Sequence, residues 1–404
     1  MLDLTPNSLT MGSQQANFNN HKTILHVRCI MFKYDIGRSP SVVALADGTL
    51  IETHTSNFPD SILYSIGTPS TKDNTIHWGK SHKYGYGFSP KLALIDQETL
   101  IEVHSIDKST SDEPPNYVTY YRIGKILFHD GLSLPSIAWG KDYAHKEGFH
   151  PAIAALDTKT VMLVDRTSIW SRQGKLNYSI GTIAHNSNNA LDYSIQWGPC
   201  CYYADGMSPT ITTIDHKTVV EMHSEIVPGI KNPTVLCRIG KLGGANQIEW
   251  KASTNCGVGV FSAPIATGPN MLVEAQGFRN YSCCHSSCRF QVKMGHIVGD
   301  SVVWDGPISE YKGILPAIAA IPGKFVVLSE VSGSFCLVKE LWCGTITYNI
   351  PQYVPYLPAT AAATTTLAPS LSHRPAFFAQ PAPSSQELPS ETTTCTAQVS
   401  TAPK

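Results

Sequence analysis

The sequence predicts an all-β fold, and more specifically a six-bladed β-propeller whose blades each have four antiparallel strands. Two observations carry this prediction. A long unit recurs along most of the chain, and the two ends of the repeated region hold incomplete units that complement each other. A repeat of this kind has room for four short strands, and a ring of such units leaves only short, protected strand edges.

The repeat is anchored on tryptophan. Trp78, Trp139, Trp197, Trp250 and Trp304 follow one another at intervals of 61, 58, 53 and 54 residues. A Gly follows each Trp by nine residues, and a Pro follows by twelve in four repeats, whereas in the remaining repeat the Pro comes two places later. The offsets from Trp to Gly and Pro are nearly constant although the intervals between Trp residues differ, which indicates one structural unit that is repeated.

The two incomplete units lie at the ends of the repeated region. Counting the same offsets back from Gly37 and Pro40 reaches Arg28, so residues 23–35 occupy the place of a Trp strand with no repeat before it. Residues 314–346 hold three strands of a repeat and then no Trp strand. We therefore expect an N-terminal strand to complete the last blade, as in a circular propeller.

Each unit is expected to hold four strands. The first is an apolar run after the Gly-x-x-Pro, as in "PSVVAL" and "PAIAAL", which indicates burial on both faces. The second alternates, as in "TLIETHT", after turn residues such as "ADGT". The third reads "LYSIGT" or "YYRIGK", and the fourth contains the Trp.

Composition sets the limits of the domain. Residues 22–350 carry the repeats and are assigned to the propeller, whereas 1–21 and the Pro-, Thr-, Ala- and Ser-rich segment 351–404 are predicted to be disordered. With 30 basic and 31 acidic side chains and no basic run, nucleic acid is not expected as a partner. No apolar stretch is long enough for a membrane span and no signal peptide is recognised, which predicts a soluble, cytoplasmic protein.

Eleven cysteines show no regular spacing, and we interpret them as free, buried thiols in a reducing compartment. The segment "YSCCHSSCRF" gathers Cys283, Cys284, His285 and Cys288. Structural zinc sites usually take ligands from two separated pairs, so a local thiol cluster or a disulfide is favoured and no metal or cofactor is predicted.

A Glu-x-His pair recurs in the second strand, as Glu52 with His54, Glu102 with His104, and Glu221 with His223. Residues two apart on a strand point to one face. A catalytic site needs only one such pair, so the recurrence favours a buried structural network that satisfies these polar groups in each blade. The Trp side chains are likewise expected to pack between blades.

The candidate binding face is formed by the links from fourth to first strands, together with the loops between second and third strands. These links keep a nearly fixed length but vary in residue, an arrangement typical of binding surfaces on a rigid scaffold. The predicted ligand-binding residues are Tyr34, Arg38, Tyr84, Tyr86, His145, Tyr203, Glu310 and Tyr311. Aromatic rings beside polar groups suit carbohydrate, but tyrosines that simply pack in short links explain the same pattern.

Two resemblances bear on function. The repeat "YRIGK…WG…G-x-x-P…VVE-x-H", over about 22–346, resembles that of lectin-like propellers, which implies several equivalent sugar sites. The segment "GRSPSVVALADGTLIETHTS" is similar to the Arg-Ile-Pro segment of sialidases, with Arg38 and Pro40 in the matching places, although the Asp-box of that family is absent from every blade.

The favoured function is therefore non-catalytic, lectin-like binding of glycans or glycoproteins. A protein-interaction scaffold that uses the same face is the alternative, and a sialidase-like glycoside hydrolase is the second alternative.

Overall fold

The computed structural model describes residues 31–347, except for 58–59, 71, 73–74, 111–112, 130–133, 168–172, 186–190, 228, 230–231, 245–246, 279–287, 322 and 333–338. The residues described form antiparallel β-strands and no α-helix, so the predicted all-β class is confirmed. Accordingly, this part of the chain has no helix that could span a membrane. The segments predicted to be disordered, 1–21 and 351–404, lie outside the described residues, as do Cys283, Cys284 and His285.

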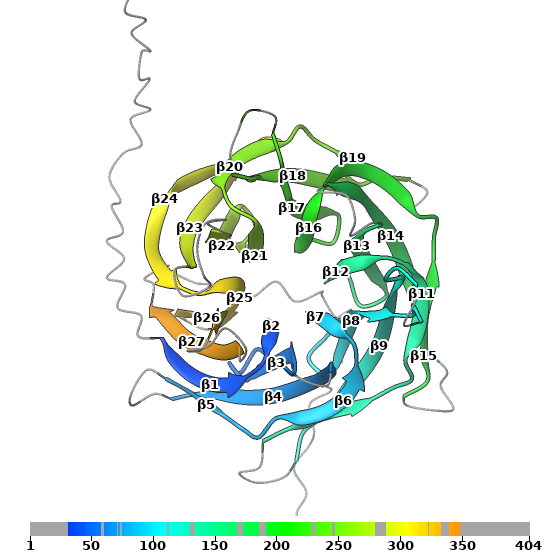
Figure 1. Ribbon diagram of the computed structural model, residues 1–404, viewed down its shortest axis with the longest axis vertical. Coiled ribbons are helices and arrows are strands. Elements are labelled where there is room, and N and C mark those ends of the chain that lie inside the picture. Colours follow the sequence, from blue (N-terminus) through cyan, green and yellow to red (C-terminus); the bar gives the residue numbers. More distant parts are fainter. Residues whose placement is uncertain are drawn as a thin grey trace, which may run out of the picture. The chain divides into compact units, whose positions relative to one another are not determined.

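Six inner strands surround a central channel (Figure 1). They are β2 (Arg38–Ala44), β7 (Phe88–Leu94), β12 (Phe149–Ala155), the second half of β16 (Cys201–Asp215), β21 (Phe261–Gly268) and β25 (Ile314–Ile321). Each contacts the next along the chain, and β25 contacts β2. Their apolar runs line a space of about 870 Å³, as expected for strands buried on both faces.

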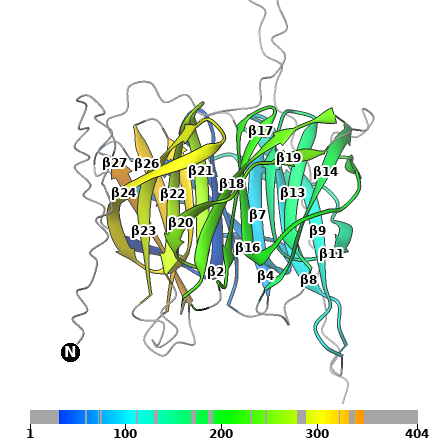
Figure 2. The ribbon, with the colours of Figure 1, turned by 90° about the horizontal axis from the view of Figure 1, so that it is seen from above.

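Two further layers of strands lie outside the inner strands. The second strands are β3 (Leu50–Thr55), β8 (Thr99–Asp107), β13 (Thr160–Arg166), β17 (Thr218–Glu225), β22 (Met271–Phe278) and β26 (Lys324–Ser332). The third strands are β4 (Ser61–Pro69), β9 (Tyr117–Leu127), β14 (Gly174–His185), β18 (Thr234–Leu242), β23 (Arg289–Val298) and β27 (Lys339–Thr347). Figure 2 shows these strands from the side. Each inner strand, its second strand and its third strand pair antiparallel, and we call such a set a unit.

The outer layer differs from the prediction. We expected one Trp strand per unit followed by a surface link, but the link is itself a strand that pairs with the third strand. The outer strands are β5 (Ile76–Trp78) with β6 (His82–Tyr86), β10 (Ser136–Trp139) with β11 (Tyr143–Glu147), β15 (Tyr193–Trp197) with the first half of β16, β19 (Ile248–Trp250) with β20 (Thr254–Val258), the continuous β24 (Ser301–Lys312), and β1 (Phe32–Ile36). The links therefore lie along the outer edge.

The ends of the repeated region meet in one sheet. Strand β1 pairs antiparallel with β27, so that Phe32 lies opposite Cys343 and Ile36 opposite Glu340. The sheet order is β1-β27-β26-β25. The two incomplete repeats seen in the sequence thus complete one four-stranded sheet.

Neighbouring units are joined by Trp side chains, as predicted. The Tyr34 ring of β1 stacks on Trp78 of the next unit at 4.9 Å between centroids, and Trp78 also packs against a core that β2, β25 and β26 build. A glycine in the third strand explains why Trp fits: a Cβ on Gly181 would lie 2.8 Å from the Trp197 ring and 2.3 Å from the Ile195 side chain. The indole therefore lies flat on glycine backbone.

The Glu-x-His pairs form the buried network that their recurrence predicted. Glu221 and His223 are at most 1% exposed, with His223 Nδ1 3.0 Å from a Glu221 carboxylate oxygen. Arg238 Nε lies 3.5 Å from the same carboxylate, and the Tyr203 hydroxyl donates to Glu221 at 2.9 Å. The equivalent histidines His54 and His104 make the same contact at 3.0 Å, so the pairs hold the second strands to their neighbours in three units.

Candidate functional site

A ring of unusual backbone conformations surrounds the end of the channel at which the inner strands begin. Five non-glycine residues there have φ between 49° and 54°, and each directly precedes a proline: Ser39, Ser89, His150, Ser208 and Leu315. Positive φ is uncommon for residues with a Cβ, and a following proline favours extended backbone. Local strain of this kind clusters at functional sites.

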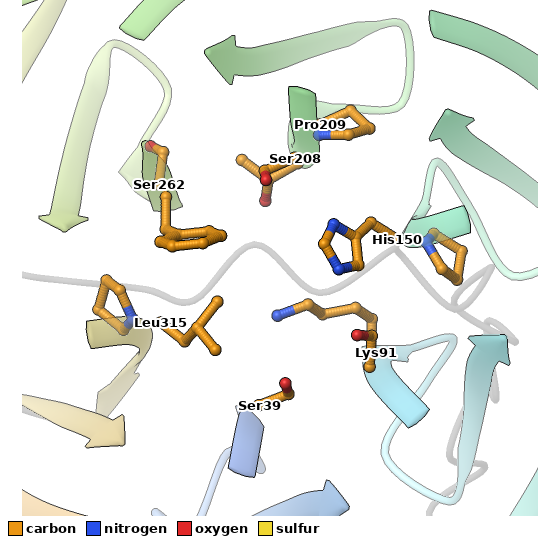
Figure 3. A pocket seen from close by; sticks show the side chains of 12 residues that line it. Ser39, Lys91, His150, Ser208, Pro209, Ser262 and Leu315 are labelled. Atoms are coloured by element: carbon orange, nitrogen blue, oxygen red, sulfur yellow. The ribbon is translucent and has the colours of Figure 1, made fainter. Parts of the chain in front are cut away.

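The strained residues line one pocket of about 490 Å³ (Figure 3), which we call the axial pocket. In the unit of β21 the proline comes two places later, and here Phe261 and Ser262 complete the lining. Lys91, Thr210 and the prolines of β12, β16 and β25 add to it. All six units thus contribute side chains to a single pocket on the axis.

Two lining residues are fixed by buried carboxylates. The Ser39 backbone N–H donates to Glu330 at 3.3 Å, and the Ser262 hydroxyl donates to Glu274 at 2.5 Å. Glu274 is fully buried, and burial raises its pKa while Lys293, 3.0 Å away, opposes that increase. The carboxylates lie behind the lining, and none of the twelve described lining residues carries one.

Three serine hydroxyls of the pocket are open to a ligand. Ser39, Ser89 and Ser208 form no side-chain hydrogen bond with any residue that the structure describes. Each hydroxyl can donate one hydrogen bond and accept two. The Phe261 ring adds an apolar surface, so the pocket offers both donors and a stacking face.

The electrostatics of the pocket come from Lys91 and His150, whose side chains point into its centre (Figure 3). Burial lowers the pKa of Lys91 to about 8. Burial lowers the pKa of His150 to about 3, and the positive charges of Lys91 and Arg166 lower it further. At neutral pH the imidazole is therefore uncharged, and the amine is the group that changes charge near pH 8.

The low pKa of His150 predicts acid sensitivity. Because the folded protein holds this imidazole neutral, its contribution to stability is complete above about pH 6.5 and is lost as the pH falls towards 3. We expect His150→Gln to retain about 1–3 kcal/mol more of its pH 7 unfolding free energy at pH 4 than the wild type does. Urea unfolding at both pH values measures this, with the exposed His77→Gln as the control. Equal losses in wild type and His150→Gln would contradict the prediction.

Four of the predicted ligand residues lie between units. The Tyr84 ring stacks on Trp139 at 4.4 Å and Tyr203 on Trp250 at 5.0 Å, as Tyr34 does on Trp78. The His145 ring packs at a tilt against Trp197, 4.4 Å away. The Tyr84 hydroxyl is 2.6 Å from Thr53 Oγ1. These rings are spread around the outer edge, and none lines the axial pocket.

The other four predicted residues are also separate from one another. Tyr311 is 8% exposed and packs on Phe290. Glu310 is exposed on β24, and Tyr86 is 60% exposed with the Lys83 ammonium over its ring. Arg38 forms an ion pair with Asp60 and is not part of the axial pocket. The structure therefore does not bring the eight residues into one site.

Sequence reasoning missed Ser39, Ser89, Lys91, His150, Ser208, Phe261 and Leu315 as lining residues. One signal was present: the residue directly before the repeated Pro varies among Ser, His and Leu inside an otherwise fixed motif. The shift of the Pro in one repeat was a second signal, because it places Phe261 at the pocket.

No protein-family model matches the sequence, and no curated protein matches it. Among solved structures the chain is similar to Trypanosoma rangeli sialidase with the inhibitor DANA, at 11% identity and a TM-score of 0.48, covering 77% of this chain and 55% of that one. It is also similar to the NanB sialidase of Streptococcus pneumoniae at 10% identity and a TM-score of 0.47, covering 80% and 70%. The chain thus spans about half the length of the trypanosomal sialidase. Similarity at this level carries no argument about function.

Proposed function

We propose that this protein is a non-catalytic carbohydrate-binding protein whose principal site is the axial pocket. One observation carries the proposal: three serine hydroxyls without a side-chain partner among the described residues, together with the Phe261 ring, line one pocket on the axis. Sugars present hydroxyls that need donors and acceptors, and C–H faces that stack on aromatic rings.

The lining favours binding over hydrolysis. Most glycoside hydrolases use two carboxyl groups that flank the scissile bond. The described lining of the axial pocket has none, because Glu274 and Glu330 lie behind it and are held by Ser262 and by the Ser39 backbone. Arg38, the residue that resembles a sialidase arginine, is occupied by Asp60.

The proposal includes a closed ring of six blades. The contacts between successive inner strands, the contact of β25 with β2, and the pairing of β1 with β27 support it. Six blades place six equivalent strand starts around one axis, and this explains why the strained residues meet there.

A glycan-array screen of the full chain tests the function. We expect binding to a related set of glycans, weakened about five- to tenfold by Phe261→Ala because the stacking surface is lost. The matched control is Phe128→Ala, which removes an exposed ring outside the pocket. Tyr86→Ala tests binding at the outer edge, where Arg38, Tyr86 and Glu310 are accessible.

The outcomes separate the alternatives. Unchanged binding by Phe261→Ala together with loss in Tyr86→Ala would move the site to the outer edge. A blank array with folded protein would refute carbohydrate binding and favour the protein-interaction scaffold.

A further inference from the structure

Lys91 differs from Lys146 and Lys293 in that its ammonium faces the axial pocket rather than a carboxylate. Lys146 lies 2.9 Å from Asp165, and Lys293 lies 3.0 Å from Glu274. In the part of the chain that the structure describes, the Lys91 ammonium has neither an ion pair nor a hydrogen bond. Lys91 is half-buried and lines the axial pocket, so a ligand in the pocket would meet this amine directly.

The position of Lys91 is set by the repeat. It directly follows the proline of its unit, and the corresponding places in the other units hold Ser41, Ala152, Thr210, Ile265 and Ala317. One ammonium therefore stands in a ring of small or uncharged residues, and it is aimed at the centre of the axial pocket (Figure 3).

The surroundings keep part of this amine unprotonated. With a pKa of about 8, about one Lys91 in ten is neutral at pH 7, compared with fewer than about one in a thousand for an ordinary lysine. A desolvated lysine of this kind is a nucleophile towards carbonyl carbon. The imidazole of His150, which is held neutral, shares the pocket and leaves Lys91 as the group that changes charge there.

We propose that Lys91 captures the open-chain aldehyde of a reducing sugar as a covalent imine. This inference rests on the proposed function and names the reacting group of its ligand. The amine nitrogen forms a bond to the aldehyde carbon, and a proton moves from nitrogen to oxygen to give a carbinolamine. The carbinolamine hydroxyl then leaves as water, taking one proton, and a C=N bond forms. No oxidant or reductant takes part, and the reaction reverses when water adds back.

Reductive trapping tests the proposal. The full-length protein is incubated with D-glyceraldehyde and sodium cyanoborohydride at pH 7, and peptide mass spectrometry measures the modified fraction of each lysine. We expect Lys91 to be modified at least about tenfold faster than the exposed Lys80 or the ion-paired Lys146, because more of its amine is neutral. Modification of Lys91 no faster than of Lys80 would overturn the inference.

Two variants distinguish covalent capture from charge alone. Lys91→Arg keeps the positive charge but cannot form the imine. Lys91→Met removes the positive charge and the ability to form the imine. Stronger retention of a reducing than of a borohydride-reduced sugar in the wild type, lost in both variants, supports capture. Retention that survives in Lys91→Arg shows that Lys91 acts as a charge and overturns the inference.

Failure of this inference and failure of the proposed function give different results. Glycan binding without trapping at Lys91 would support the proposed carbohydrate function and refute imine capture. Trapping at Lys91 with a blank glycan array would show that the lysine is reactive and refute the carbohydrate function.

Discussion

Replacing Glu221 with alanine is expected to lower the free energy of unfolding by about 3–5 kcal/mol, because it leaves buried cationic and polar groups without their partner. Arg238 Nε, His223 Nδ1 and the Tyr203 hydroxyl all contact this carboxylate, which is fully buried. The loss therefore combines an uncompensated guanidinium with two unsatisfied hydrogen-bonding groups. Urea unfolding followed by tryptophan fluorescence measures it.

The control is Glu249→Ala, which removes a carboxylate that is 70% exposed and pairs with Lys251 at the surface. We expect it to cost less than about 1 kcal/mol. Glu221→Gln provides a milder variant if the alanine protein does not fold. Equal stability of the Glu221 and Glu249 variants would show that the recurring Glu-x-His network does not support the fold.

A chain that begins at Gly37 is expected to melt at least about 10 °C below one that begins at Met31, and to associate. The shorter chain lacks β1, so β27 loses its pairing partner and Trp78 loses the Tyr34 ring that stacks on it. An unpaired strand edge is a template for pairing with another chain. Thermal melts and light scattering after size-exclusion chromatography compare the two proteins. Identical melting and a monomeric Gly37 protein would show that β1 does not complete the sheet.

The repeat arithmetic predicted the strand layers well because it depends on backbone geometry. A strand requires only a suitable alternation, and the offsets among Trp, Gly and Pro located the inner, second, third and Trp-containing strands without knowledge of their neighbours. The link strands of the outer layer were not predicted. The burial of Glu52 with His54 followed from the same regularity, since a polar pair repeated in three second strands is explained by structure more readily than by chemistry.

The axial pocket could not be predicted in the same way. Its lining depends on the left-handed backbone of residues such as Ser39 and Ser208, and a residue before proline is ordinarily expected to be extended. The packing of the tyrosines could not be predicted for a related reason. A Tyr in a link of fixed length suggests a surface loop, yet pairing of the link with the third strand turns the Tyr84 ring onto Trp139.

The pairing of β1 with β27 also bears on how the chain is synthesised. Among the described strands, β1 comes first in the sequence and its partner β27 comes last. Lys33 and Glu340, which join across this pair, are separated by 307 residues. Contacts between residues so distant in sequence form slowly, because a long loop must close first. Intermediate units can assemble as they emerge, but β1 cannot complete its sheet until β27 is available. During that interval β1 is an unpaired strand, and nascent chains rather than finished protein are the form most exposed to mispairing.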